Sequence, residues 1–269
     1  MAEVEESGIG RAFKLFEYFD NVRRPVGVVE ATEVLGFPRS STAALFTTLV
    51  KLGYLTHDRA TRSYIPTAKL SDLGRWSDSV LFGEDRTVIA QFAKQVGRAT
   101  AETVVIGIRD DLDAQYIYVE LPQRPVLYLV QAGARRPLCR SAVGWALLST
   151  VGDDEIARIV ARWNRLSPQP STAMPLEAVR KEVERVRSSG YAFSRHSFVQ
   201  GIGMIAVLLP QRPGVRRMAV GVGGPVDRLD ARKHEIIGAL HDAIASILPL
   251  NSDGVATNDS GLAAAARDC

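Results

Sequence analysis

The chain has 269 residues, a mass of 29.3 kDa and a formal net charge of +3, with 46% hydrophobic and 23% charged residues. This length predicts about two domains, and the ordinary composition excludes a collagen-like or wholly disordered chain. The N-terminus is acidic and the chain has no run of about 18 apolar residues, so we expect neither a secretory signal nor a membrane span. The presence of only two cysteines, Cys139 and Cys269, favours a reducing compartment. We therefore expect a cytoplasmic protein with no membrane contact and no disulfide framework.

The charge is distributed unevenly along the chain. Residues 9–76 carry ten Lys or Arg against six Asp or Glu, so this segment holds the whole positive surplus. Phosphate neutralisation depends on local rather than global charge. The distribution therefore favours a small nucleic-acid-binding unit joined to a larger, near-neutral sensing unit.

The basic segment shows the pattern of three short helices followed by a hairpin. Apolar residues that share one face predict helices over residues 12–19, 28–35 and 45–52. The run Arg39–Thr42 offers hydroxyl caps for the third helix, and residues 54–65 alternate around a polar turn as in a β-hairpin. This order is that of a winged helix-turn-helix, whose last helix reads DNA, although an arbitrary small helical bundle fits the pattern alone.

The larger segment mixes strands and helices. Its strand-like runs are residues 103–108, 115–120, 126–131, 203–209 and 218–222, of which the first three predict a meander. Its helix-like runs are residues 85–96, 141–150, 154–164, 175–187 and a closing helix over 228–248. An antiparallel sheet with segregated helices predicts an α+β fold.

Several motifs, in order, resemble the IclR family of bacterial transcription regulators. In the basic segment they are Gly10–Phe16, Glu30–Thr42 and Leu49–Leu55. Downstream, Gly133–Leu148 resembles the stretch that opens the main helix of the family's effector domain, and Ser189–Pro225 resembles its closing sheet. The resemblance covers nearly all of residues 10–248 and implies an N-terminal winged helix-turn-helix with a C-terminal GAF-like α+β effector-binding domain.

The patterns and the resemblance together predict the domain boundaries. We expect a flexible leader over 1–8, a DNA-binding domain over 9–76, a linker over 77–85, an effector-binding domain over 86–250 and a disordered tail over 251–269.

The start of the third helix holds the main DNA-binding candidates, because side chains and free N–H groups there can meet phosphates and base edges. The candidates are Arg39, Ser40, Ser41, Thr42 and Thr47, with Arg11, Arg24, Arg59 and Arg62 as possible phosphate ligands. Simple helix capping and a solvated turn are the alternative explanations. Ala44 stands where members of the family commonly carry an arginine, so the operator sequence does not transfer from relatives.

The resemblance also implies a small-molecule pocket in the C-terminal domain. Its residues would be Arg140, Ser141, Ala142, Val143, Gly144, Ser194, His196, Met204, Gly221 and Gly223. Family members that bind very small keto acids are expected to have an acid, a cysteine and two serines where this chain has Ser194, Met204 and the two glycines. We interpret the glycines as enlarging the cavity and Met204 as adding apolar surface, which predicts a bulkier effector such as an aromatic acid.

Catalytic motifs are missing from the chain. It has no Gly-x-Ser-x-Gly, no phosphate-binding loop and no His pair at i, i+4, and Trp145 stands where a cysteine phosphatase would need an arginine six residues after Cys139. We therefore expect no enzyme activity, cofactor or metal site. The resemblance implies a regulator, most simply a repressor, that binds double-stranded operator DNA and a small effector as a homodimer or a dimer of dimers. A ligand-converting enzyme with an accessory DNA-binding head, and a winged helix that contacts another protein, are the alternatives.

Overall fold

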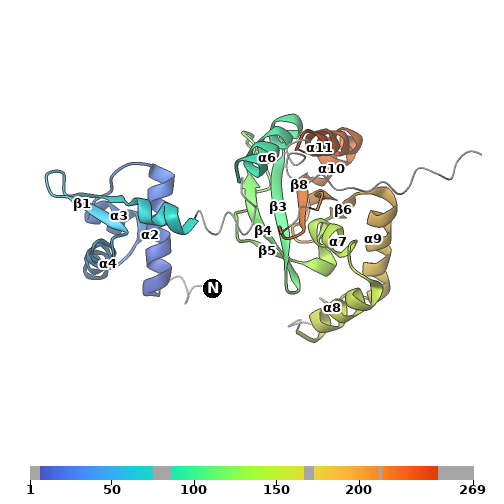
Figure 1. The fold of residues 1–269 in the computed structure, drawn as a ribbon, viewed down its shortest axis with the longest axis horizontal. Helices are drawn as coiled ribbons and strands as arrows, with labels where there is room; N and C mark the ends of the chain where they lie inside the picture. Colours follow the sequence, from blue (N-terminus) through green and yellow to red (C-terminus); the bar gives the residue numbers. More distant parts are fainter. Residues whose placement is uncertain (1–6, 75–85, 167–172, 212–213, 248–269) are drawn as a thin grey trace, which may run out of the picture. The chain divides into compact units, whose positions relative to one another are not determined.

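The structure, a computed structural model, describes residues 7–74, 86–166, 173–211 and 214–247. The chain divides into two compact units, residues 1–80 and 81–269, and each is described by itself (Figure 1). Most of the predicted leader, the linker and the tail lie outside the described residues. Within the described part of the chain, no helix has the length and apolar character needed to cross a membrane.

The first unit is a helix-turn-helix with a small hairpin. Its elements are α2 (Gly8–Val22), α3 (Val28–Leu35), α4 (Arg39–Lys51), β1 (Leu55–Asp58) and β2 (Ser63–Pro66). The order confirms the prediction from apolar spacing. The core gathers the apolar faces of the helices and hairpin around Phe46, whose ring meets Tyr64 at 4.6 Å and Phe19 at 6.4 Å between centroids.

A tight turn joins α3 to α4. Gly36 ends α3 with φ of 67°, a conformation that costs glycine little, and Pro38 stands directly before the first residue of α4. Because proline has no N–H and a fixed φ, it stops α3 from continuing and starts α4 in a new direction. The turn therefore places α4 against the core with one face outward.

The second unit is built on a six-stranded antiparallel sheet in the order β5-β4-β3-β8-β7-β6. The strands are β3 (Thr103–Asp110), β4 (Asp113–Glu120), β5 (Arg135–Pro137), β6 (Ala192–Arg195), β7 (Ile202–Leu208) and β8 (Met218–Pro225). This arrangement confirms the predicted α+β class.

Helices cover both faces of this sheet (Figure 1). One face carries α6 (Arg86–Thr100), α10 (Val226–Ala231) and α11 (Lys233–Ile247). The other carries the 3-10 turn η1 (Leu138–Arg140), α7 (Ala142–Leu148), α8 (Asp153–Leu166) and α9 (Leu176–Ser189). Alternate strand residues serve the two layers: Val104 and Ile106 face the first core, whereas Val105 faces the second.

Two glycines let α7 lie close to the sheet. A Cβ on Gly107 of β3 would lie 2.7 Å from Val143 Cγ1, and one on Gly221 of β8 would lie 3.0 Å from Val143 Cγ2. Side chains at either position would push α7 outward. The close approach places the start of α7 over the middle of the sheet.

The strand predicted over residues 126–131 is wrong. This segment pairs with no strand, and β5 takes the place next to β4 through partners from Asp113 to Gln115. The physical reason is visible at Tyr128, whose carbonyl accepts a hydrogen bond from Thr103 Oγ1 at 2.6 Å instead of from a ladder N–H.

The closing helix predicted over 228–248 is two helices, α10 and α11. Arg232 ends α10 with φ of −112° and ψ of 18°, which breaks the helical path one residue before α11 begins. Its side chain donates to the Thr100 carbonyl at 2.8 Å and thereby ties the break to the end of α6.

The strand β6 was not predicted, because its four residues are too few to show a clear alternation.

Candidate nucleic-acid interface and ligand pocket

The outward face of α4 is formed by small and basic side chains. Its exposed residues are Arg39, Ser40, Ala43, Ala44, Thr47, Thr48 and Lys51. The basic residues stand at the two ends of the helix and only small side chains lie between them. A helix with this face can approach the floor of a groove while its ends meet phosphates.

The first turn of α4 has no side-chain cap, so the predicted hydroxyl capping is wrong. Ser41 Oγ and Thr42 Oγ1 donate to the carbonyl of Pro38, at 2.8 Å and 3.1 Å, instead of accepting from N–H groups. The positive end of the helix is therefore not neutralised by its own side chains. Thr42 is only 1% exposed, which places it in the core and not on the outward face.

Arg11 comes from α2 to the start of α4. Its Nη1 donates to Ser41 Oγ at 3.2 Å, and its guanidinium lies 5.9 Å from the centre of the Phe37 ring. The structure thus brings together Arg11 and Ser41, which are far apart in the sequence. Arg39 extends from the same turn and is exposed.

The hairpin tip is held by Asp58, a residue the sequence reasoning did not single out. Its carboxylate accepts hydrogen bonds from Thr61 Oγ1 at 2.8 Å and from the Ala60 N–H at 2.9 Å, and these bonds lower its pKa. Asp at the start of a turn is the signal that could have identified it. Arg59 and Arg62 are both exposed at this tip.

Arg24 is already engaged within the unit. Its guanidinium donates to both oxygens of Glu30, at 3.0 Å and 2.6 Å, and Tyr18 donates to the same carboxylate at 2.7 Å. The bonds from Arg24, and then that from Tyr18, lower the pKa of Glu30. Arg24 is therefore a weaker phosphate candidate than Arg39, which has no hydrogen-bond or ion-pair partner within the part of the chain that the structure describes.

A small cavity of about 20 Å³ lies in the second unit, beside the start of α7. It is lined by Tyr116, Tyr128, Ser141, Ala142, Ser194, Ser197, Phe198, Val199, Ile202, Gly203 and Met204. This volume suits about one water molecule. The structure therefore shows the pocket closed, and a larger ligand needs a lining residue to move.

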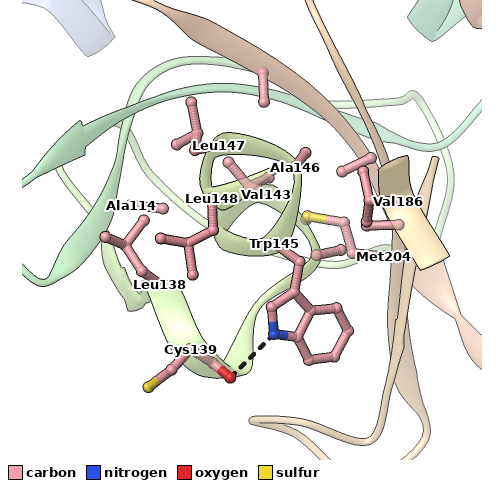
Figure 2. Close-up of a cluster of buried hydrophobic side chains, with 14 of the residues drawn as sticks. Ala114, Leu138, Cys139, Val143, Trp145, Ala146, Leu147, Leu148, Val186 and Met204 are labelled. Atoms are coloured by element: carbon pink, nitrogen blue, oxygen red, sulfur yellow. Dashed lines mark hydrogen bonds between the residues drawn. The ribbon is translucent and has the colours of Figure 1, made fainter. Parts of the chain in front are cut away.

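Met204 fills the space that the sequence reasoning assigned to the ligand. A Cβ on Gly221 would lie 2.6 Å from Met204 Sδ, and one on Gly223 would lie 2.9 Å from both Met204 Cε and Tyr128 Cδ1. Figure 2 shows the Met204 side chain beside α7. The two glycines thus make room for Met204 and Tyr128, and the prediction that they enlarge the cavity is wrong.

The first turn of α7 is occupied by its own packing. Ser141 Oγ accepts from the Gly144 N–H at 3.1 Å and donates to the Pro137 carbonyl at 2.9 Å. Trp145 Nε1 donates to the Cys139 carbonyl at 3.0 Å (Figure 2). Gly144 is therefore a packing residue whose N–H is already used, and Val143 packs against the sheet.

Burial raises the pKa of Cys139 to about 12, which leaves a thiol of low reactivity.

Residues 196–201 form a loop over the cavity. His196 Nδ1 accepts from the Gly201 N–H at 3.0 Å, so His196 closes the loop at its base and is not one of the lining residues. Arg140 donates to the Ser197 carbonyl at 3.3 Å and holds the loop from the α7 side.

Sequence reasoning missed three aromatic lining residues, Tyr116, Tyr128 and Phe198. The only signal for Tyr116 is its inward position in the alternation of β4. Within the described ranges, no three His, Cys, Asp or Glu side chains are grouped so that they could hold a metal ion.

A winged helix-turn-helix joined to an α+β ligand-binding unit defines a one-component transcription regulator. The helix-turn-helix model of the IclR family matches residues 8–59, and the model described as bacterial transcriptional regulator IclR C-terminal matches residues 85–248. The chain belongs to the IclR family of bacterial transcription regulators, which are not enzymes. It binds DNA through the first unit and an effector through the second.

Relatives match over most of the chain. The regulator KdgR of Escherichia coli is 26% identical over 226 residues, which cover 83% of this chain and 85% of KdgR. The transcriptional repressor IclR of Escherichia coli is 20% identical over 242 residues, which cover 86% and 84%. The crystal structure of Thermotoga maritima IclR, at 18% identity, has a TM-score of 0.62 and covers 89% of this chain and 98% of that one, which shows a shared fold.

Proposed function

We propose that this regulator is a cytoplasmic repressor that binds double-stranded operator DNA through α4 and the hairpin, and that a small organic acid in its effector domain releases it. The observation that carries the DNA-binding part is the outward face of α4, with an uncapped first turn and basic ends. The naming of the Escherichia coli relative IclR as a repressor supports the direction of regulation.

The positions of the side chains favour distinct roles on DNA. Ser40 and Thr47 stand on the outward face of α4 and can reach base edges, whereas Arg39 and Arg11 at its start can meet phosphates. Arg62 is exposed on the hairpin, which supports a contact with the flanking DNA backbone. Ala44 offers no hydrogen bond, so guanine readout at that position is lost.

Operator reading through a helix-turn-helix favours two copies of the chain. Two recognition helices that bind adjacent half-sites need a twofold arrangement. We therefore propose a homodimer, and with it the dimer of dimers that the family resemblance implies. Ligand binding would change the spacing of the two heads and so the affinity for DNA.

The wall of the cavity favours an organic acid with an apolar body as the effector. Tyr116, Tyr128, Phe198 and Met204 supply aromatic and soft apolar surface, and Ser141 and Ser194 supply polar groups.

A gel-shift titration on the DNA upstream of the chain's own gene tests the DNA-binding proposal. We expect specific binding that weakens steeply with salt, and Arg39→Ala should weaken it roughly tenfold and lower the salt slope by about one. Arg98→Ala removes an exposed arginine from α6 in the effector unit and serves as the charge-matched control. If fragments covering the whole genome bind no better than unrelated DNA, the proposal is wrong and a protein partner of the winged helix becomes the better explanation.

A further inference from the structure

Two arginines beside the closed cavity have no carboxylate partner. Among the described residues of the effector unit, the other half-buried arginines all form ion pairs with Asp or Glu: Arg109, Arg180, Arg228 and Arg232. Arg136 and Arg140 are equally half-buried, yet neither meets a carboxylate there. A half-buried cation without a counter-ion is unfavourable unless something else compensates for the lost water.

Arg136 contacts three residues that line the cavity. Its Nη2 donates to Tyr128 Oη at 2.9 Å, and its guanidinium lies 5.8 Å from the Tyr116 ring centre and 5.3 Å from that of Phe198. Its Nε is buried and has no hydrogen-bond partner. Its Nη1 donates to the Arg135 carbonyl at 2.8 Å, so among the described residues only the Nε–H of this guanidinium lacks an acceptor.

Arg140, the last residue of η1, also lies near the Phe198 ring. Its guanidinium lies 5.8 Å from the Phe198 ring centre, so Phe198 has a cation near it from both Arg136 and Arg140. Cation–π contacts at half-exposed sites are weaker than charge-assisted hydrogen bonds. An anion would satisfy both guanidinium groups better than the ring does.

Phe198 stands on a loop outside the sheet. The ring is 42% exposed and lies in the loop that leaves the sheet after β6. Both ends of that loop have positive φ, 54° at His196 and 82° at Gly201, so the loop folds back on itself. Backbone hydrogen bonds hold its ends, from the His196 N–H to the Ile202 carbonyl at 2.9 Å and from the Val226 N–H to the Gly201 carbonyl at 2.8 Å, whereas the Ser197 carbonyl beside Phe198 is held by the Arg140 side chain.

We propose that Arg136 and Arg140 together bind the carboxylate of the effector, which takes the place of the Phe198 ring, while the apolar body of the effector packs on Tyr116, Tyr128 and Met204. This inference rests on the proposed effector-responsive function and names its ligand class: a monocarboxylate with an aromatic or other apolar body. Arg136 supplies the more specific contact, because its unpartnered Nε and its Nη2 form one planar edge that matches two carboxylate oxygens.

Isothermal titration calorimetry on the full-length protein tests the ligand class. The probes are benzoate, phenylacetate and hexanoate, each taken to millimolar concentration, with benzyl alcohol as the neutral counterpart of benzoate. We expect at least one of the three carboxylates to bind and benzyl alcohol to bind at least about tenfold more weakly than benzoate. Binding of none of the three, or equal binding of benzyl alcohol and benzoate, would overturn the proposal.

Variants of Arg136 test the anchor itself. Arg136→Met should weaken carboxylate binding by about tenfold or more, and Arg136→Lys should restore part of it, since lysine keeps the charge but loses the planar fork. Arg98→Met lowers the net charge equally and should leave binding unchanged. Unchanged affinity in Arg136→Met would contradict the assignment.

Binding of the upstream DNA by the same Arg136→Met protein separates this inference from the function on which it rests. We expect unchanged DNA affinity in the absence of acid, which also shows that the variant is folded. If the wild-type protein shows no specific DNA binding, the regulator proposal is wrong. If it binds the DNA specifically but does not prefer carboxylates over benzyl alcohol, only the assignment of Arg136 and Arg140 as the carboxylate anchor is wrong.

Discussion

The helices that begin the two candidate sites, α4 and α7, meet their surroundings in opposite ways. The first turn of α4 is exposed at Arg39 and Ser40 and carries no side-chain cap. Every residue of α7 is buried, and Ser141 caps its first turn. DNA is a large polyanion that can only be met by an exposed surface, whereas a small acid is recognised best where walls exclude water. The exposed start of α4 is therefore suited to DNA, whereas the buried start of α7 is not.

The same contrast applies to two Glu–Arg pairs of similar chemistry. Glu30 in the DNA-binding unit bonds Arg24 with side-chain exposures of 31% and 55%. Glu102 in the effector unit bonds Arg228 with exposures of 0% and 27%. Removing the carboxylate charge is expected to matter far more at the second pair, since Glu102 is fully buried and its arginine partner is less exposed to water than Arg24.

Gly144→Ala should give the largest effect. A Cβ at this position would lie 2.3 Å from the Leu138 carbonyl oxygen and 2.5 Å from Leu138 Cα, so backbone must move. We expect the free energy of unfolding of the effector unit to fall by about 3 kcal/mol or more, measured by urea unfolding followed by circular dichroism.

A second helical glycine of the same unit, Gly238 in α11, is the matched control for Gly144. A Cβ there would meet nothing within 4 Å. Gly238→Ala should therefore stabilise the unit, by about 0.5–1 kcal/mol. Equal effects of the two substitutions would show that the start of α7 is less tightly packed than the comparison requires.

Glu102→Gln should give the next largest effect. Arg228 Nη2 donates to Glu102 Oε2 at 2.7 Å, and Arg124 and Arg232 lie within 4.0 Å of the same carboxylate. The neutral amide would leave this group of arginines without a counter-charge. We expect a loss of about 2–3 kcal/mol in the free energy of unfolding, measured by urea unfolding. If Glu102→Gln lowers the free energy of unfolding no more than Glu30→Gln does, the expected difference between the two Glu–Arg pairs is wrong.

Glu30→Gln should give the smallest effect, at most about 1 kcal/mol, because the pair it breaks is largely in water. The pKa of Glu30 is lowered in the folded protein below its ordinary value of 4.5, so the stabilisation is present above that value and is lost as the pH falls through the lowered pKa. The wild-type DNA-binding unit should therefore lose more stability than Glu30→Gln on acidification. Hydrogen exchange followed by mass spectrometry can resolve this unit, and parallel pH profiles would contradict the prediction.

Local patterns predicted the elements of this protein better than its site. Apolar spacing indicated the helices of the DNA-binding unit, and the same spacing places Thr42 with Phe46 and Leu49 on the buried face of α4. Grouping Thr42 with its polar neighbours hid this signal. The strand expected over 126–131 failed because a side chain distant in sequence, Thr103, takes the carbonyl of Tyr128.

The closed pocket could not be predicted from any local pattern. Met204 fills the space above Gly223 because the β7–β8 register pairs the two residues across the sheet. Phe198 lies near two guanidinium groups because a loop after β6 folds back over η1 and β5. Both facts depend on the pairing of distant segments, which the residue types do not reveal.

The most direct test of the account is the affinity for the upstream DNA, measured by fluorescence anisotropy, with and without a saturating carboxylate that the calorimetry identifies. We expect the acid to weaken DNA binding by wild-type protein at least about fivefold, within the usual range of coupling free energies, and to leave the Arg136→Met protein on its DNA at the same concentration. Equal DNA affinity of the wild-type protein with and without the bound acid would contradict the claim that the closed pocket controls the exposed face of α4.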